Sequence, residues 1–373
     1  MYLKCTSQIR KIFDMGAVVL AESKSLFDMV SVIPKSGLAN LAKHEYKSGG
    51  YTPLDMVCYK YWWDPVLNLI PLKMAPNLIT VIGFLFALSN LLTIYITNPE
   101  LRGSPSSFTQ IWAGFSFLFY MMMDAIDGRQ ARRTKSGSPL GQLLDHGCDS
   151  ILSGVISIVL ASTLRIGVGM DLFILMAVSQ IVFFIGQWEE KHTGVCRTCV
   201  LGLFGTTEYL LSFSALQIGV LFLEDISLLR SLVFYSTLAI GLASGLYCII
   251  NVLVHTRKIS SIATIFPILL LNVLFGCIIS SSPVSSFIPF LSLSLLNSFL
   301  IIQTILSTVT RTPVSMCNQL LIISPAIGMA IAAPVPENLL LAYTILVGIC
   351  VCQYVVRAVL QISNFLNIKV FRI

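Results

Sequence analysis

The stretch that decides the fold runs from Asp124 to Asp149 and reads DAIDGRQARRTKSGSPLGQLLDHGCD. Its polar and small residues follow the spacing Asp124-x2-Asp127-Gly128-x2-Ala131-Arg132-x8-Gly141-x3-Asp145-x3-Asp149. Apolar segments flank the stretch on both sides, so its carboxylates lie in or beside candidate membrane helices. A carboxylate at membrane depth costs about 2.5–3.5 kcal/mol, and residues retained at that cost indicate a functional site.

The composition of the whole chain points to a membrane protein. Hydrophobic residues make up 55% of the 373 residues and charged residues 11%, against about 25% charged residues in a soluble domain. The net charge of +6 is interpreted as topology and contact with anionic lipid. Because no basic run with interleaved aromatic residues occurs, nucleic acid is not a predicted partner. The ten cysteines are scattered, many of them in apolar runs, which indicates buried thiols and not a disulfide framework.

Apolar segments long enough to cross a bilayer recur along the chain. We therefore predict an all-α integral membrane protein with about ten transmembrane helices. Residues 15–33 predict an interfacial helix. The predicted regions are a cytosolic or interfacial N-terminal part (1–73), a catalytic six-helix membrane domain (74–255) and a C-terminal four-helix membrane region (256–373). The predicted spans are 78–96, 109–128, 142–164, 171–189, 206–223, 231–254, 261–281, 286–307, 317–333 and 338–360.

The distribution of basic residues predicts the orientation of these spans. With ten spans, 21 of the 24 lysines and arginines fall on one side, and only Arg102, Arg165 and Arg230 fall on the other. The positive-inside rule then places both termini in the cytosol. It also places the loop between Asp127 and Asp145 on the cytosolic side.

The four aspartates are spaced to meet. Asp124 and Asp127 are three residues apart at the end of one span, and Asp145 and Asp149 are four apart near the start of the next, so each pair shares a helix face. A helical hairpin would bring the faces together, and carboxylates that close repel unless cations lie between them. Their hard oxygen ligands suit Mg²⁺, Mn²⁺ or Ca²⁺ and do not suit Zn²⁺. A solvated acidic face is the alternative, and the number of specified positions weighs against it.

Glycines and an arginine complete this predicted site. One or two divalent ions would leave positions open for phosphate oxygens. Arg132 offers a fork for a diphosphate. Gly128 and Gly141 permit close approach of a ligand or a neighbouring helix.

The same string resembles the sequence motif of the CDP-alcohol phosphotransferase family, with every motif position filled. The flanking segments Tyr61-Trp62-Trp63-Asp64-Pro65, Met74 to Thr80 and Ser138 to Ser150 look like the eukaryotic choline/ethanolamine phosphotransferase branch, over residues 40–255. One departure is Gln142, where an acidic residue is expected. The resemblance implies the fold of that family, two Mg²⁺ or Mn²⁺ ions held by Asp124, Asp127, Asp145 and Asp149, and cleavage of a CDP-alcohol with release of CMP.

Residues around the motif have predicted roles with alternatives. His146, beside Asp145, is the candidate general base, and a structural histidine is the alternative. Glu208 either orients His146 or serves as an N-terminal helix carboxylate. Asn77 is predicted to cap the first span, and the resemblance implies that it binds the CDP-alcohol together with Gly128, Arg132 and Gly141. His192, Cys196 and Cys199 form a weak candidate for zinc.

We therefore predict an enzyme of phospholipid biosynthesis that transfers phosphocholine or phosphoethanolamine from its CDP form to diacylglycerol. The alternatives are a CDP-diacylglycerol-dependent phosphatidyltransferase and, in another class, a cation-coupled transporter. The resemblance implies the endoplasmic reticulum or Golgi as location, with a cytosolic active site, and a homodimer is predicted. The sequence does not decide between choline and ethanolamine or between diacyl and alkyl-acyl acceptors, and it assigns no chemistry to the last four helices.

Overall fold

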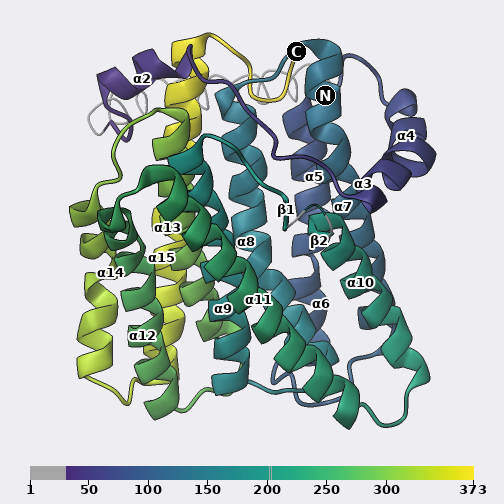
Figure 1. Ribbon diagram of the computed structural model, residues 1–373. Helices are drawn as coiled ribbons and strands as arrows, with labels where there is room; N and C mark the ends of the chain where they lie inside the picture. Colours follow the sequence, from purple (N-terminus) through teal and green to yellow (C-terminus); the bar gives the residue numbers. More distant parts are fainter. Residues whose placement is uncertain (1–30, 201, 203) are drawn as a thin grey trace, which may run out of the picture.

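The computed structural model describes residues 31–200, 202 and 204–373. The interfacial helix predicted for residues 15–33 lies almost wholly outside the described residues. The N-terminal elements are short: α2 (Lys35–Leu41), α3 (Pro53–Cys58), the π-helical turn η1 (Tyr59–Trp63) and α4 (Asp64–Leu69). They lie at one end of a bundle of long helices (Figure 1).

Helices occupy all ten of the predicted spans. They are, in chain order, α5 (Pro76–Leu88) with α6 (Asn90–Thr97), α7 (Ser107–Thr134), α8 (Pro139–Thr163), α9 (Met170–Thr193), α10 (Thr206–Gly219) with the 3₁₀ turn η2 (Val220–Phe222), α11 (Ser227–Thr256), η3 (Ile259–Ile265) with α12 (Phe266–Ser281), α13 (Ile288–Val309), α14 (Met316–Ile331) and α15 (Glu337–Leu366). A two-stranded antiparallel ribbon, β1 (Cys199–Val200) and β2 (Phe204–Gly205), precedes α10.

Seven helical segments in the described part of the chain are long and apolar enough to cross a membrane. α7, α10 and α14 are not among them: α7 carries the charged motif, and α10 and α14 have 14 and 16 residues. A total of ten spans and the cytosolic termini stay predictions.

The centre of the bundle is formed by α8 and α13. In their most apolar stretches 78% and 83% of the residues are buried, against 17% for α11, so α11 lies at the periphery. α13 packs against α8, α9 and α15, as Figure 1 shows. Helices from the two sides of residue 255 thus share one core, and the domain division at that residue stays a prediction.

Polar side chains join these central helices at depth. The Gln180 side chain on α9 donates to the Ser294 carbonyl on α13 (3.0 Å), and Asn297 on α13 donates to the Gln180 side-chain carbonyl (3.0 Å). Asn272 on α12 donates to the Asn297 side-chain oxygen (3.0 Å). All of these residues are buried. Because hydrocarbon offers no alternative partners, such interhelical hydrogen bonds fix which helices meet and in which register.

The α7–α8 hairpin holds the decisive stretch. α7 ends at Lys135 in the left-handed conformation, and Ser138 begins α8 by accepting from the Gly141 amide. Pro139 occupies the first helical position, where the missing N–H is not needed. The hairpin is held from outside: Arg133 on α7 donates to the carbonyls of Leu67 and Ile70 at 2.8 and 2.5 Å. The turn between the two aspartate pairs is therefore fixed in place.

Close contact of α5 with α7 depends on Gly83. A Cβ at this position would lie 2.7 Å from the Met123 Cβ, a distance that side chains do not tolerate. We expect Gly83→Ala to lower stability by about 1–3 kcal/mol through overpacking, measured as a drop in the Tm of the detergent-purified protein. The control is Gly186→Ala on α9, where a Cβ meets nothing within 4 Å. Alanine there adds helix propensity, so an equal loss of Tm in both variants would contradict the overpacking argument.

Candidate metal centre and its surroundings

Three of the four predicted aspartates converge. Asp124 on α7 and Asp145 and Asp149 on α8 each place a carboxylate oxygen within 4.8 Å of the oxygens of the other two. The spacing of four residues puts Asp145 and Asp149 on the α8 face that meets α7. The hairpin predicted from the sequence thus brings carboxylates from both helices together.

Asp127 lies beside this group with a partner of its own. Its carboxylate is buried (5% exposed) and accepts a hydrogen bond from the Thr80 hydroxyl on α5. Its charge still acts on Asp145 and Asp149, so it belongs to the same electrostatic cluster. Asp149 also has a hydrogen-bond donor, since its carboxylate accepts from the Tyr120 hydroxyl on α7.

The cluster fits a hard divalent cation. Within the described part of the chain, the buried Asp145 Oδ1 has no hydrogen-bond donor. An uncompensated buried carboxylate oxygen is costly, and here two further carboxylates lie within 4.8 Å of the Asp145 carboxylate. Mg²⁺ or Mn²⁺ would satisfy Asp145 and offset the mutual repulsion of the cluster. The donor set therefore suits the predicted metal, and the number of ions stays a prediction.

Arg132 is the exposed arginine at the end of α7. Its neighbours have structural contacts: Arg129 pairs with Asp64 and lies over the Tyr59 ring at 3.7 Å, and Arg133 binds backbone carbonyls. Arg132 passes close to Gly128, where a Cβ would lie 3.5 Å from its Nη1. The chain thus leaves Arg132 accessible to an anion, beside a glycine that leaves room for one.

Asn77 lies next to Gly141, whose Cβ would be 3.5 Å from the Asn77 side-chain oxygen. The prediction that Asn77 caps its helix is wrong. α5 has Ala75 as its N-cap without a side-chain cap and Pro76 as its first residue, so Asn77 is already inside the helix. Its amide instead donates to the Val370 carbonyl of the C-terminal segment (2.8 Å). The absence of a capping role does not test the predicted binding of a ligand by Asn77 and Gly141, which stays a prediction.

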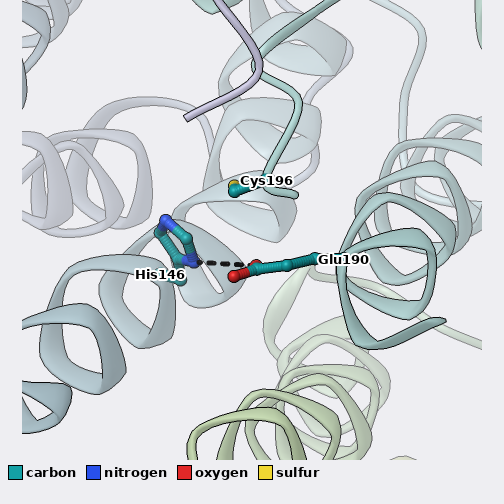
Figure 2. Close-up of side chains that lie close together, drawn as sticks. All are labelled: His146, Glu190 and Cys196. Atoms are coloured by element: carbon teal, nitrogen blue, oxygen red, sulfur yellow. Dashed lines mark ion pairs between the residues drawn. The ribbon is translucent and has the colours of Figure 1, made fainter. Parts of the chain in front are cut away.

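His146 is buried (6% exposed), and its two ring nitrogens have different surroundings. Nε2 lies 3.9 Å from the Asp145 Oδ2, on the side of the aspartate cluster. Nδ1 lies 3.2 Å from the Gln187 side-chain oxygen and 4.0 Å from the Glu190 Oε2. Figure 2 shows the Glu190 carboxylate pointing toward the ring from α9. Gln187 and Glu190 offer acceptors for a proton on Nδ1, and in that tautomer Nε2 carries the lone pair.

Of the two roles predicted for Glu208, the structure supports that of a carboxylate at a helix N-terminus. Its Oε2 accepts from the Gly205 amide (2.9 Å) at the start of α10. The carboxylate that the structure places on the Nδ1 side of His146 is that of Glu190.

The sequence did not single out Glu190. Glu189 and Glu190 lie beside Lys191 at the end of a predicted span, a pattern typical of an interfacial charged cluster, whereas their exposed fractions are 1% and 4%. Each buried carboxylate has a polar partner: Glu189 pairs with Arg197 (3.0 Å), and Glu190 accepts a hydrogen bond from the Gln142 amide (2.6 Å). The one available signal was Gln142. A neutral amide at that position can donate to Glu190, whereas the expected acidic residue would repel it.

His192, Cys196 and Cys199, the weak candidate for zinc, do not converge in the structure. Cys196 is buried near His146 and Glu190, with ligand atoms within 4.8 Å of one another. The His192 ring packs edge-on against Trp188, and Cys199 lies in β1. Neighbours in sequence are here separated by the turn that ends α9.

Comparison with known proteins finds one family model and several relatives that resemble this chain. Residues 73–254 match the sequence model of the CDP-alcohol phosphatidyltransferases. Uncharacterized CDP-alcohol phosphatidyltransferase class-I family protein 3 of Dictyostelium discoideum is 39% identical over 44% of this chain and 41% of its own length. Choline/ethanolaminephosphotransferase 2 of Arabidopsis thaliana is 29% identical over 90% of this chain and 97% of its own. Cholinephosphotransferase 1 of Mus musculus is 36% identical over 43% and 40%. Some of these matches thus span less than half of the relative.

Proposed function

Because the chain belongs to the CDP-alcohol phosphatidyltransferases through residues 73–254, we propose that it transfers phosphocholine or phosphoethanolamine from the CDP-alcohol to diacylglycerol. The products are phosphatidylcholine or phosphatidylethanolamine and CMP. The observation that carries this proposal is the meeting of Asp124, Asp145 and Asp149 beside the buried His146. The name of the Arabidopsis relative, which aligns along nearly its whole length, supports the choice of headgroups.

In this reaction the aspartates and Arg132 act on the diphosphate. Bound divalent cations supply positive charge that stabilises the CMP leaving group. The aspartates hold those cations, Asp127 among them with its orientation fixed by Thr80. Arg132 binds phosphate oxygens through its guanidinium. Gly128 and Gly141 leave space for the nucleotide, and Asn77 beside Gly141 binds the CDP-alcohol once its side chain is released from Val370.

His146 acts on the lipid. Its Nε2 accepts the proton of the diacylglycerol hydroxyl while the hydroxyl oxygen forms a bond to the β-phosphorus. The bond from that phosphorus to the bridging oxygen breaks, and CMP leaves with the oxygen. Gln187 and Glu190 hold the other ring nitrogen and stabilise the ring when it becomes positively charged.

The location follows from the two substrates. A CDP-alcohol is soluble in water and diacylglycerol is not, so a site at the end of membrane helices serves both. We place the protein in the endoplasmic reticulum or Golgi membrane, with the site open to the cytosol, as a homodimer. Membrane lipid is then both solvent and source of the acceptor.

The test is CMP release by the purified protein in mixed micelles. Arms contain CDP-choline, CDP-ethanolamine or CDP-diacylglycerol, each with diacylglycerol or with inositol, and with Mg²⁺, Mn²⁺ or a chelator. We expect CMP and labelled phospholipid only with a CDP-aminoalcohol, diacylglycerol and metal together. Turnover of CDP-diacylglycerol with inositol would overturn the headgroup assignment. Cation flux in liposomes without any CMP release would overturn the enzyme assignment.

A further inference from the structure

A second group of potential metal ligands lies directly beside the aspartates. His146, Glu190 and Cys196 come from α8, α9 and the turn after α9, and each is less than 7% exposed. Their ligand atoms lie within 4.8 Å of one another. Figure 2 shows the three side chains around one small volume, with the Cys196 sulfur above the Glu190 carboxylate and the imidazole.

We propose that His146, Glu190 and Cys196 form a Zn²⁺ site, and that zinc bound there inhibits the enzyme. Nitrogen, oxygen and thiolate sulfur are the ligands that Zn²⁺ takes, and three protein ligands with one open position are a common arrangement for it. Mg²⁺ and Mn²⁺ prefer oxygen ligands and do not compete well for a thiolate. Two adjacent centres would then select different metals. Asp145 belongs to the aspartate centre, and the next residue, His146, belongs to the zinc site.

Backbone contacts fix the position of Cys196, while its thiol contacts the Tyr46 and Glu190 side chains. Its amide donates to the Lys47 carbonyl (2.9 Å), and its carbonyl accepts from the Gly49 amide (2.6 Å). The segment before α3 thus holds the sulfur over His146 and Glu190. The Tyr46 ring, from the same segment, packs edge-on against the His146 ring (6.2 Å between centroids). Replacement of the thiol leaves the backbone contacts in place.

Inhibition follows from the geometry of the imidazole ring. The nitrogen that faces Glu190 is Nδ1, and Nε2 faces Asp145. A neutral imidazole has one proton and one lone pair on its two nitrogens. When a metal takes the lone pair at Nδ1, the proton has to reside on Nε2. The nitrogen proposed to accept the lipid proton is then already protonated. This inhibitory effect rests on the proposed function, whereas metal binding itself does not.

Binding is tested directly with Co²⁺, a coloured substitute for Zn²⁺, titrated into the full-length purified protein in saturating Mg²⁺. We expect one Co²⁺ with a thiolate charge-transfer band, displaced by Zn²⁺. Cys196→Ala and Cys196→Ser should lose the band and bind at least about 100-fold more weakly, since even outer-shell changes around a metal cost 10–100-fold. The matched control is Cys199→Ala, three residues away on β1, which should keep the band. Binding without the band, or equal binding by the Cys196 variants, would refute the site.

Inhibition is tested separately in the CMP assay. Zinc should inhibit the unmodified protein at concentrations where Cys196→Ala keeps its activity, and a chelator should restore the activity of the former. If both proteins are inhibited alike, zinc acts at the aspartates and the regulatory inference fails. If no preparation releases CMP, the proposed function fails, while the Co²⁺ result still decides the site.

Discussion

Replacing Asp149 by asparagine is expected to abolish transfer at every Mg²⁺ concentration. The substitution preserves the shape of a side chain that shares one volume with Asp124 and Asp145 but removes its charge. Loss of a cation ligand removes several kcal/mol of charge stabilisation in the transition state. Because each 1.36 kcal/mol is a tenfold change in rate, turnover should fall by at least about 1000-fold. The measurement is CMP release across an Mg²⁺ titration.

Tyr120→Phe provides the matched control. The Tyr120 hydroxyl donates to the Asp149 carboxylate, so this variant keeps the charge of Asp149 and loses the hydrogen bond from that hydroxyl. We expect it to retain most of its activity and to need somewhat more Mg²⁺. A Tm close to that of the unmodified protein shows that the Asp149→Asn variant is folded. Substantial turnover by a folded Asp149→Asn protein would remove the aspartate from the metal centre.

The second large effect is expected for His146→Asn. Asparagine is short and polar and can still donate a hydrogen bond toward Gln187, but it has no basic nitrogen. Loss of a general base typically costs 10²–10⁴-fold, so we expect the kcat to fall by about that factor. Binding of the CDP-alcohol should change little, because it depends on the metal ions, Arg132 and Asn77. Equilibrium binding of labelled CDP-choline, measured beside turnover, separates the two effects.

His44→Asn is the control for a general disturbance of this region. His44 lies on the far side of Gln142, with its Nε2 2.6 Å from the Gln142 side-chain oxygen. It shares the hydrogen-bond network of Glu190 without facing the aspartate cluster. We expect a small change in kcat. If His44→Asn and His146→Asn lose activity and nucleotide binding equally, the base assignment is untenable and both histidines serve packing.

The parts of the fold that depend on local pattern could be predicted from the sequence. Apolar stretches of spanning length located the helices of the bundle, though not the short N-terminal helices α2 to α4, because the bilayer requires internally satisfied backbone over that length. The i, i+4 spacing of Asp145 and Asp149 placed both on one face for the same local reason. The short turn between α7 and α8 then left few ways for the faces to meet.

Contacts between distant segments could not be predicted in this way. Nothing in the spacing of Asp127 reveals that the Thr80 hydroxyl on α5 donates a hydrogen bond to its carboxylate. Nothing near Glu190 reveals that Gln142, 48 residues earlier, makes its burial tolerable. Cys196 is the clearest case, since its sequence neighbours suggested a zinc trio within one loop, whereas packing placed its sulfur beside a helix 50 residues away.

The hydrogen bond from Asn297 to Gln180 links positions 117 residues apart, and this separation has a consequence for biogenesis. At about 5–20 residues per second of translation, α9 leaves the ribosome roughly 6–23 s before α13 exists, by the same rate. Throughout that interval the nascent Gln180 amide has no native partner, although hydrocarbon penalises an unsatisfied amide. We therefore expect the first half of the chain to stay beside the insertion machinery, where water can hydrogen-bond to the Gln180 amide, until α13 has been synthesised.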